Sequence, residues 1–462
     1  MLISALCEVN TMAANYTLKR KLYDQLLDWK HNACGKSAVM VEGARRVGKS
    51  TVVEAFAQTE YEDYLLLDFT METPEVLDNF RYVGNLDMFF RNLFLLKGKE
   101  LPKHRSVIIF DEVQLFPLAR QAIKPLVADG RYDYIETGSL ISIKKNVSKI
   151  LIPSEEHKLK MYPMDFEEFL WATDNTVTAP AIRDAFEART PLGDNIHRRF
   201  MQDFRAYLAV GGMPQAVAAY AAGESYQQIE RTKDEILSLY EDDLEKFDDE
   251  EGARASAVFR SIPSQLSHHN ARFRYAAVGR NARATNIASA LDFLRKSMMA
   301  NLCTNVTSPE VALDLYEDMS SFKLFVGDTG LLLSQIMRAS PDDGQELQRL
   351  LVAGRLGVNL GMIMENAVAQ ALVASGHQLH FHTFEAARDG KPIPHEVDFL
   401  VVRGRRLCPL EVKSSGYRRH ASLDQFIKRY NVGGAESYIL TPKDLSREGN
   451  VTYIPLYMSM CL

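Results

Sequence analysis

The sequence predicts an α/β protein whose first part is a parallel sheet wrapped by helices. Short apolar runs alternate there with stretches of helical periodicity and polar turns, which is typical of a doubly covered parallel sheet. One of these runs passes through a glycine-rich turn directly into a helix. Near the C-terminus, two more apolar runs flank a turn at Gly404 and predict a β-hairpin in a second α/β region.

The glycine-rich turn carries the full pattern Gly-x-x-x-x-Gly-Lys-Ser, directly after the apolar run Ala38–Val41. Glycines let successive backbone N–H groups face one anion, and the N-terminus of the following helix favours negative charge. The lysine can reach the β- and γ-phosphates, and the serine hydroxyl can ligate Mg²⁺. The alternative, a plain turn before a surface helix, does not explain the complete pattern. We predict a P-loop that binds ATP and Mg²⁺ through Gly43, Ala44, Arg45, Arg46, Val47, Gly48, Lys49, Ser50 and Thr51.

Further apolar runs, at 64–69, 106–112 and 132–139, predict the strands that complete this site. The second run ends in Asp111 and Glu112. An acid that ends such a strand is expected to hold Mg²⁺, and the carboxylate beside it can act as general base toward water. Thr137 or Ser139, at the end of the next strand, contacts the γ-phosphate or positions the water; the alternative is a simple turn at Gly138. The carboxyl ends of parallel strands meet at one edge, so we expect Ser50 to lie there with these residues.

Composition excludes several classes of protein. The chain has 462 residues, a net charge of −6, 46% apolar and 25% charged residues, which is ordinary for a soluble globular protein of about three domains. Five scattered cysteines without C-x-x-C spacing argue against a disulfide framework and a zinc site. Neither a signal peptide nor a membrane-spanning run is predicted. We expect a cytoplasmic protein with no membrane partner.

A second group of charged residues lies near the C-terminus. Asp398 and Glu411 fall on the two strands of the predicted hairpin, and Lys413 lies two residues after Glu411 on the same face. Glu365 lies in the strongly helical stretch 362–372. We expect Asp398 and Glu411 to share a Mg²⁺ while Lys413 helps to activate water. Without a cation, one of two such close carboxyls should keep its proton near neutral pH. An inert cluster of ion pairs is the alternative.

A basic stretch precedes this region. Arg272, Arg274, Arg280 and Arg283 have few acids near them, and phosphate contacts to DNA need such charges. The helical pattern at 286–295 and predicted strands near 298–306 and 322–328 suggest a helix-turn-helix with a wing. DNA binding and a protein-packing module with a solvated basic face remain equal alternatives.

Residues 43–50, 111–114, 137–139 and 162–169 together resemble prokaryotic AAA+-type ATPases related to signal-transduction ATPases. The resemblance implies a P-loop parallel-sheet AAA+-type core with a helical lid, a winged helix and a C-terminal PD-(D/E)xK nuclease-like α/β domain. It also implies that Pro214, in the segment Gly211–Ala216, packs near the adenine. We expect an N-terminal helical segment at 1–35, the ATPase core at 36–170 and the helical lid at 171–240. The winged-helix-like domain is expected at 241–340 and the nuclease-like domain at 341–462.

One departure from the family concerns assembly. Many AAA+ rings use an arginine from a neighbouring subunit, and residues 132–182 contain no arginine. Lysine is a poorer clamp for a phosphoryl group, so a homo-oligomer of the usual ring type is in doubt. The predicted function is an ATPase coupled to nucleic acid. The alternative is a nucleotide-controlled switch whose C-terminal domains bind protein and do not cut; a P-loop kinase is disfavoured because no acceptor-substrate motif is present.

Overall fold

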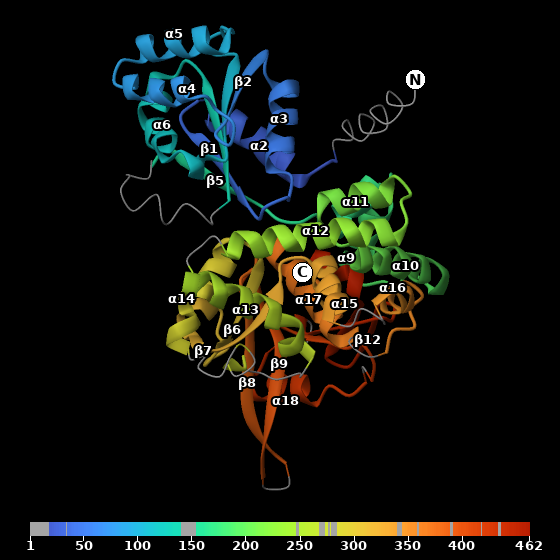
Figure 1. Cartoon of the computed structure of the whole chain (residues 1–462). Helices are drawn as coiled ribbons and strands as arrows, with labels where there is room; N and C mark the ends of the chain where they lie inside the picture. The colour runs from blue at the N-terminus through green and yellow to red at the C-terminus, as the bar shows by residue number, and fades with distance from the viewer. Residues whose placement is uncertain are drawn as a thin grey trace. The chain divides into compact units, whose positions relative to one another are not determined.

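The structure is a computed structural model that describes residues 18–33, 35–139, 154–245, 249–267, 273–275, 278, 284–339, 344–357, 360–388, 391–416, 418–432 and 436–462. The chain divides into two compact units, residues 1–162 and 163–462 (Figure 1). Each unit contains its own β-sheet. No helix among the described residues is both long and apolar enough to cross a membrane.

The first unit is built on the predicted parallel sheet. Its strand order is β2-β3-β4-β1-β5, and every neighbouring pair is parallel. β1 and β3 are buried along their whole length, which explains their uninterrupted apolar sequences. β5 was not predicted, because it is largely charged and only two of its side chains are buried. The bounds are β1 (Ala38–Gly43), β2 (Asp63–Asp68), β3 (Ser106–Asp111), β4 (Asp133–Gly138) and β5 (Glu156–Met161).

Helices cover this sheet and supply an aromatic core. Phe80, Phe89 and Phe110 pack edge to face in a buried cluster that joins β1–β4 to α4, α5 and α6. The predicted N-terminal helix is present as α2 and packs on α3. The bounds are α2 (Lys21–Ala33), α3 (Lys49–Glu60), α4 (Pro74–Asn79), η2 (Phe80–Tyr82), α5 (Leu86–Lys97), η3 (Val113–Leu115) and α6 (Pro117–Asp129).

The second unit contains a mixed sheet of eight strands in the order β12-β13-β11-β10-β9-β8-β6-β7. The predicted hairpin is confirmed: β9 and β10 are antiparallel, and Gly404 takes a left-handed φ of 63° between them. The bounds are β6 (Ala300–Val306), β7 (Glu317–Val326), β8 (Leu379–Arg388), β9 (Lys391–Arg403), β10 (Arg406–Val412), β11 (Tyr438–Thr441), β12 (Ser446–Glu448) and β13 (Val451–Pro455).

This sheet crosses the domain boundary that the sequence analysis placed at residue 340. The two strands expected in a wing exist as β6 and β7, and β6 pairs in parallel with β8. The middle region of the chain therefore contributes strands to the same sheet as the C-terminal region. The winged helix itself stays a prediction.

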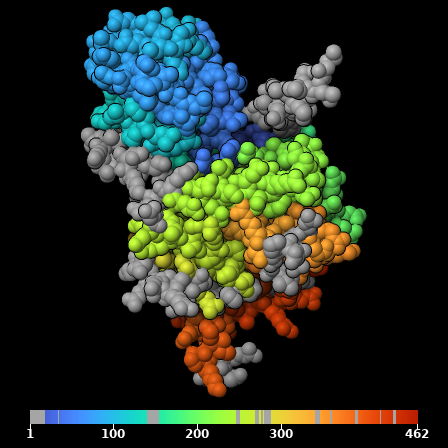
Figure 2. Space-filling view, in the orientation of Figure 1, coloured from blue at the N-terminus to red at the C-terminus, as the bar shows by residue number. Residues whose placement is uncertain are grey.

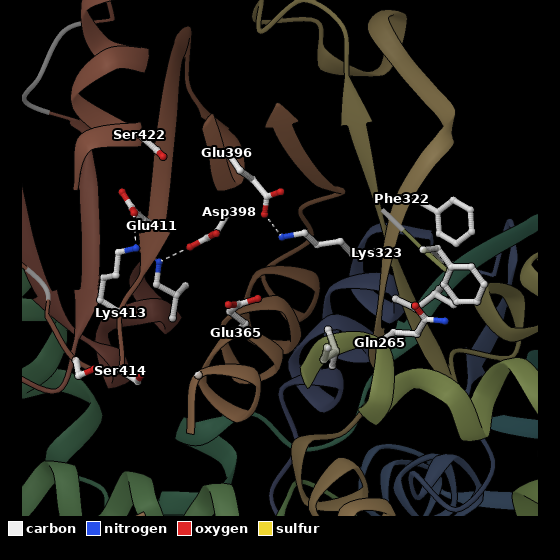
Figure 3. Close-up of a pocket in the computed structure, with 16 residues that line it drawn as sticks. Gln265, Phe322, Lys323, Glu365, Glu396, Asp398, Glu411, Lys413, Ser414 and Ser422 are labelled. Carbon is white, nitrogen blue, oxygen red and sulfur yellow. Dashed lines mark hydrogen bonds and ion pairs between the residues drawn. The ribbon is translucent and has the colours of Figure 1, made fainter. Parts of the chain in front are cut away.

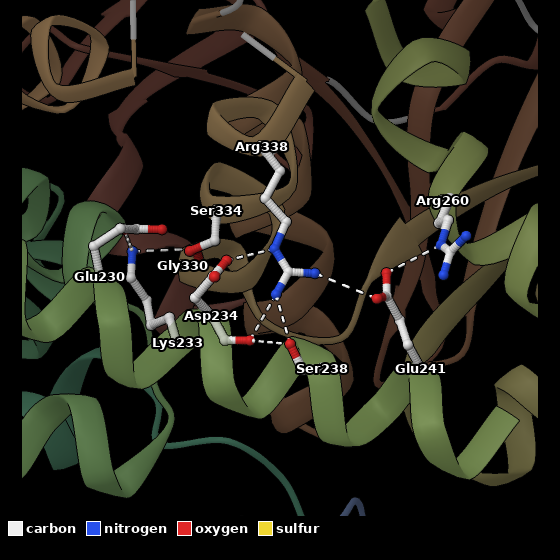
Figure 4. A network of polar contacts seen from close by, with 9 residues as sticks. All are labelled: Glu230, Lys233, Asp234, Ser238, Glu241, Arg260, Gly330, Ser334 and Arg338. Atoms are coloured by element: carbon white, nitrogen blue, oxygen red, sulfur yellow. Dashed lines mark hydrogen bonds and ion pairs between the residues drawn. The ribbon is translucent and has the colours of Figure 1, made fainter. Parts of the chain in front are cut away.

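The helices of the second unit include those expected in the lid. Figure 4 shows how α12 is fixed to α15 by Arg338, whose Nη2 donates to Asp234 O at 2.6 Å and to Ser238 Oγ at 3.0 Å. In the space-filling view, α12 and α13 form a broad part of the visible surface of this unit (Figure 2). The bounds are α8 (Phe166–Ala172), α9 (Thr178–Ala188), α10 (Asp194–Val210), α11 (Pro214–Ala221), α12 (Tyr226–Glu245), α13 (Asp249–Ser267), α14 (Ala284–Lys296), η5 (Leu313–Tyr316), α15 (Thr329–Ala339), α16 (Gly344–Val352), α17 (Leu360–Ala374), α18 (Ala421–Tyr430) and η7 (Leu456–Cys461).

Helix α17 is the central helix of this unit. Nine of its 15 residues are buried, which accounts for its apolar sequence, and it packs against β6, β7, β8 and β10. Asn366 and Gln370 anchor it to the start of α15 by hydrogen bonds to Thr329. Packing and these hydrogen bonds therefore fix the position of α17, and with it the polar side chains that the helix directs toward the sheet.

Candidate nucleotide site and candidate metal site

The glycine-rich turn has the strand–turn–helix geometry that the sequence predicts. β1 ends at Gly43, α3 begins at Lys49, and Gly48 between them has a left-handed φ of 92°. A Cβ on Gly43 would lie 2.4 Å from Met161 O, so only glycine fits where this strand leaves the sheet. Such a turn directs backbone N–H groups toward a shared anion site.

Lys49 is buried and folds back over this turn. Its Nζ donates to Gly43 O at 3.1 Å and to Ala44 O at 3.0 Å. Burial lowers the pKa of Lys49, although Glu112 and Asp111 act in the opposite direction. The ammonium group is thus held at the loop by weak neutral acceptors, which phosphate oxygens can replace.

Asp111 joins three elements at the carboxyl edge of the sheet. Its Oδ1 accepts a hydrogen bond from Ser50 Oγ at 2.8 Å and another from Thr137 Oγ1. Burial raises the pKa of Asp111, and the two hydroxyl groups partly offset this. A carboxylate beside a serine hydroxyl supplies the oxygen ligands that Mg²⁺ prefers, so these residues fit the cation.

Glu112 has a left-handed backbone, with φ 54° and ψ 45°, which costs energy for a residue other than glycine. Its N–H donates to Thr137 Oγ1 at 3.2 Å, and its carboxylate accepts from Gln114 Nε2. Gln114 also donates to Ser139 Oγ at 3.4 Å. Thr137 therefore touches both acids directly. Gln114 was not predicted as a site residue, because no general rule assigns a role to a glutamine two residues after such an acid.

Comparison with family models gives a match to the region that contains the glycine-rich turn and Asp111. An AAA domain model matches residues 35–170. Residues 35–170 form an AAA-type ATPase domain. Two further models, each described as a domain of unknown function, match residues 201–342 (DUF8612) and 360–458 (DUF4143). No curated protein matches the chain at a significant level.

Two solved structures are distantly similar to this chain. A Walker-type ATPase of Pyrococcus abyssi is 14% identical, with 70% of this chain and 97% of that chain covered and a TM-score of 0.41. Cdc6p of Pyrobaculum aerophilum is 10% identical, with 75% and 99% covered and a TM-score of 0.28.

The second unit holds a cavity of about 370 Å³ with an unusual concentration of charge. Four carboxylates and two ammonium groups line it, from β7, β9, β10, α17 and the loop after β10 (Figure 3). These residues are Glu365, Glu396, Asp398, Glu411, Lys323 and Lys413. The four predicted C-terminal site residues are thus all present in one cavity.

The hairpin places the two central acids side by side. Leu410 lies opposite Phe399 in the register of β9 and β10, so the next residue on β10, Glu411, lies beside Asp398. Val412 N donates to Asp398 Oδ2 at 2.8 Å, and Lys413 Nζ lies 2.6 Å from Glu411 Oε1. The predicted convergence of these side chains is confirmed, whereas their roles remain predictions.

The charges in this cavity shift proton affinities strongly. Burial, then repulsion by Asp398, raises the pKa of Glu365 to about 8. Burial and Asp398 also raise the pKa of Glu411. Glu365 therefore retains a proton at neutral pH, as expected for crowded carboxyls without a cation. Glu411 Oε2 is buried and has no hydrogen-bond partner among the described residues, so an oxygen atom is free to ligate a divalent cation.

Lys323 and Glu396 belong to this cavity but were not predicted. Lys323 on β7 forms an ion pair with Glu396 on β9. Burial lowers the pKa of Lys323, but the surrounding acids outweigh burial and leave it raised. The two residues are 73 positions apart, and only the pairing of distant strands brings them together.

The predicted DNA contacts are only partly described. Arg272, Arg280 and Arg283 lie outside the described residues. Arg274 is exposed, and its backbone N–H donates to Gln265 Oε1 at 2.9 Å. Because Gln265 lines the acidic cavity, Arg274 is fixed close to it. Pro214 begins α11 in the second unit, and its contact with adenine stays a prediction.

Proposed function

We propose that ATP turnover in the AAA domain controls a second unit that binds a nucleic-acid phosphodiester at one divalent cation and cleaves it. The observation that carries this proposal is the meeting of Glu365, Asp398, Glu411 and Lys413 in one cavity, with a buried carboxylate oxygen left without a partner. Structural hydrogen-bond networks normally satisfy such atoms. In a cation site, a carboxylate oxygen lacks a hydrogen bond because it ligates the cation instead.

In the AAA domain, each residue has a defined role in the proposal. Lys49 releases the loop carbonyls and holds the β- and γ-phosphates. Ser50 and Asp111 hold Mg²⁺, and Thr137 keeps Asp111 in place. Glu112 takes a proton from the attacking water. Gln114 orients the Glu112 carboxylate through its hydrogen bond.

In the second unit, Asp398, Glu411 and Glu365 would hold the divalent cation, which stabilises charge on a phosphate oxygen when it is bound. Attraction to Glu411 raises the pKa of Lys413 despite burial. Lys413 is therefore an ammonium group near neutral pH and cannot be the base. Its role is to stabilise the negative charge that develops on phosphate, which refines the role expected from the sequence.

In this proposal, the nucleic-acid strand passes close to Arg274. Its side chain is exposed and its backbone is bonded to Gln265, a lining residue of the acidic cavity. A guanidinium group in this place can bind the phosphate next to the one held at the cation. Arg295 and Lys296 at the end of α14 are less available to phosphate, because both pair with Asp292.

The alternative function is a nucleotide-controlled switch that binds protein and does not cut. The ion pairs Lys413–Glu411 and Lys323–Glu396 favour it, because they neutralise half of the acids, as an inert cluster would.

Two assays test the proposal. ATPase rates of the full chain are measured with and without single- and double-stranded DNA, and cleavage of DNA and RNA is measured with Mg²⁺ or Mn²⁺ and ATP. We expect nucleic acid to stimulate hydrolysis and the wild type to cut. Lys413→Met should lose cleavage and keep the basal ATPase rate. If the wild type cleaves neither DNA nor RNA, and its ATPase rate does not change when nucleic acid is added, the switch is favoured.

Matched variants separate the two roles in the AAA domain. Lys49→Ala should lose most nucleotide binding. Glu112→Gln should bind ATP normally and hydrolyse it about 10²–10⁴-fold more slowly, which is the usual effect of removing a general base. Equal loss of binding in both variants would show that Glu112 is structural.

A further inference from the structure

A different cavity of the second unit, of about 420 Å³, has the opposite electrical character from the acidic one. Leucine and methionine side chains of α10, α16 and α17 form much of its wall. Its charged lining consists of Arg205 and Lys443, and no Asp or Glu of the described residues lines it. A positive apolar hollow is unexpected in a chain with a net charge of −6.

Arg205 is the central group of this cavity. Its side chain is partly buried, yet it makes no hydrogen bond or ion pair with any residue that the structure describes. Burial alone lowers its pKa. A buried charge without a partner is costly, and arginine in such places is normally paired.

Gly354 creates the space that this guanidinium group occupies. A Cβ at Gly354 would lie 2.6 Å from Arg205 Cζ and 2.7 Å from its Nη1. Gly354 also has a left-handed φ of 69°, which favours glycine at this turn after α16. The turn thus accommodates a guanidinium group facing the cavity.

Other donors complete the polar part of the lining. Lys443 is exposed, and its backbone N–H donates to Thr441 Oγ1 at 2.9 Å. Ser414 and Ser415, which carry hydroxyl donors, also line this cavity. Two cations with hydroxyl donors suit a doubly charged anion better than a carboxylate. Phosphate monoesters carry close to two charges at neutral pH, and arginine binds them through two parallel hydrogen bonds.

We propose that this cavity binds a phosphate monoester with an apolar body. The phosphate lies between Arg205, Lys443 and the two serines, and the body packs against the leucine and methionine wall. The volume is within the range of small-molecule sites. Both a free mononucleotide and the terminal phosphate of a nucleic-acid strand have this chemistry.

The position of the cavity links it to the acidic one. Ser414 and Ser415 line both cavities and directly follow Lys413. Met364 lines the basic cavity and directly precedes Glu365. A phosphate bound here lies next to the proposed metal site, although the binding proposal does not depend on cleavage there.

The test uses phenyl phosphate, titrated calorimetrically into the full chain. Lys49→Ala serves as the background, so that the P-loop does not contribute. We expect binding, with phenol and inorganic phosphate each weaker than phenyl phosphate. Arg205→Gln should weaken binding about tenfold or more, since a hydrogen bond to a charged group is lost. Arg198→Gln, an exposed position on the same helix, should change nothing.

The outcomes decide the proposal. Absence of binding at millimolar phenyl phosphate, or equal binding by a folded Arg205→Gln variant, would overturn it. If Arg205→Gln does not fold, the exposed Lys443→Gln variant supplies the same comparison with a smaller expected loss. Thymidine 5′-monophosphate and oligonucleotides with a 5′-phosphate or a 5′-hydroxyl distinguish the source: preference for the phosphorylated strand over the free nucleotide identifies a strand end, and the reverse identifies a metabolite.

Discussion

Replacing Lys323 with methionine should tighten the binding of a divalent cation in the acidic cavity. When all groups are ionised, the four carboxylates and two ammonium groups of this cavity carry a net charge of −2. One divalent cation balances that charge. Lys323 is buried among Glu396, Glu365 and Asp398. Its removal makes the net charge of the cavity more negative by one, which attracts the cation more strongly.

The size of the effect follows from Coulomb's law. At an effective dielectric constant of about 20, an ammonium group and a divalent cation roughly 8 Å apart repel by about 4 kcal/mol. Proton uptake offsets part of this, because the pKa of Glu365 is already about 8. We therefore expect cation binding to become about tenfold tighter, or about 1.4 kcal/mol. Without a cation, loss of the buried ion pair between Lys323 and Glu396 should destabilise folding by about 3–5 kcal/mol.

Calorimetric titration with Mn²⁺ at pH 7 measures this effect, in a Ser50→Ala background that weakens the cation site of the P-loop. The control is Lys323→Met with Glu396→Gln, which restores the net charge and should return the affinity to near the wild-type value. Equal affinity in the single and double variants would refute the charge-balance reasoning. Thermal melting with and without Mn²⁺ should show the larger stabilisation by metal in the single variant.

Three further predictions concern other parts of the second unit. Gly211→Ala places a Cβ 2.4 Å from Asp328 Oδ1 at a φ of 84°, so urea unfolding should show a loss of about 2–4 kcal/mol. Burial lowers the pKa of His382; its contribution to stability is complete above about pH 6.5 and is lost as pH falls toward the folded pKa, so melting between pH 7 and 5 should decline less in His382→Gln. If DNA binds near Arg274, its replacement by alanine should lower the slope of log K against log salt by about 1, whereas Arg349→Ala, an exposed control, should not.

The turn of the candidate nucleotide site and its acidic strand end could be predicted from sequence, because the geometry of each is local. Eight consecutive residues determine the turn, and Asp111 follows a strand whose burial is evident from its sequence. The hairpin with Asp398 and Glu411 could also be predicted from sequence, because a short turn fixes the register of its two strands. Side-chain period and turn length were sufficient in both cases.

Features that depend on long-range pairing could not be predicted. The strands β6 and β7 were expected, but their place in the C-terminal sheet depends on the pairing of β6 with β8, and nothing in either sequence specifies that partner. The role of Lys323 was missed for the same reason. Arg205 was missed because an unpaired guanidinium group is a property of its surroundings.

The shared sheet has a consequence for how this protein can be divided. A fragment that begins at residue 341 would keep Asp398 and Glu411 but lose β6 and β7, leaving β8 with an open edge of unpaired N–H and C=O groups. Such an edge invites association with other chains, so the fragment is expected to aggregate. The region that one family model matches at 360–458 thus depends for its solubility on strands of the region that another model matches at 201–342.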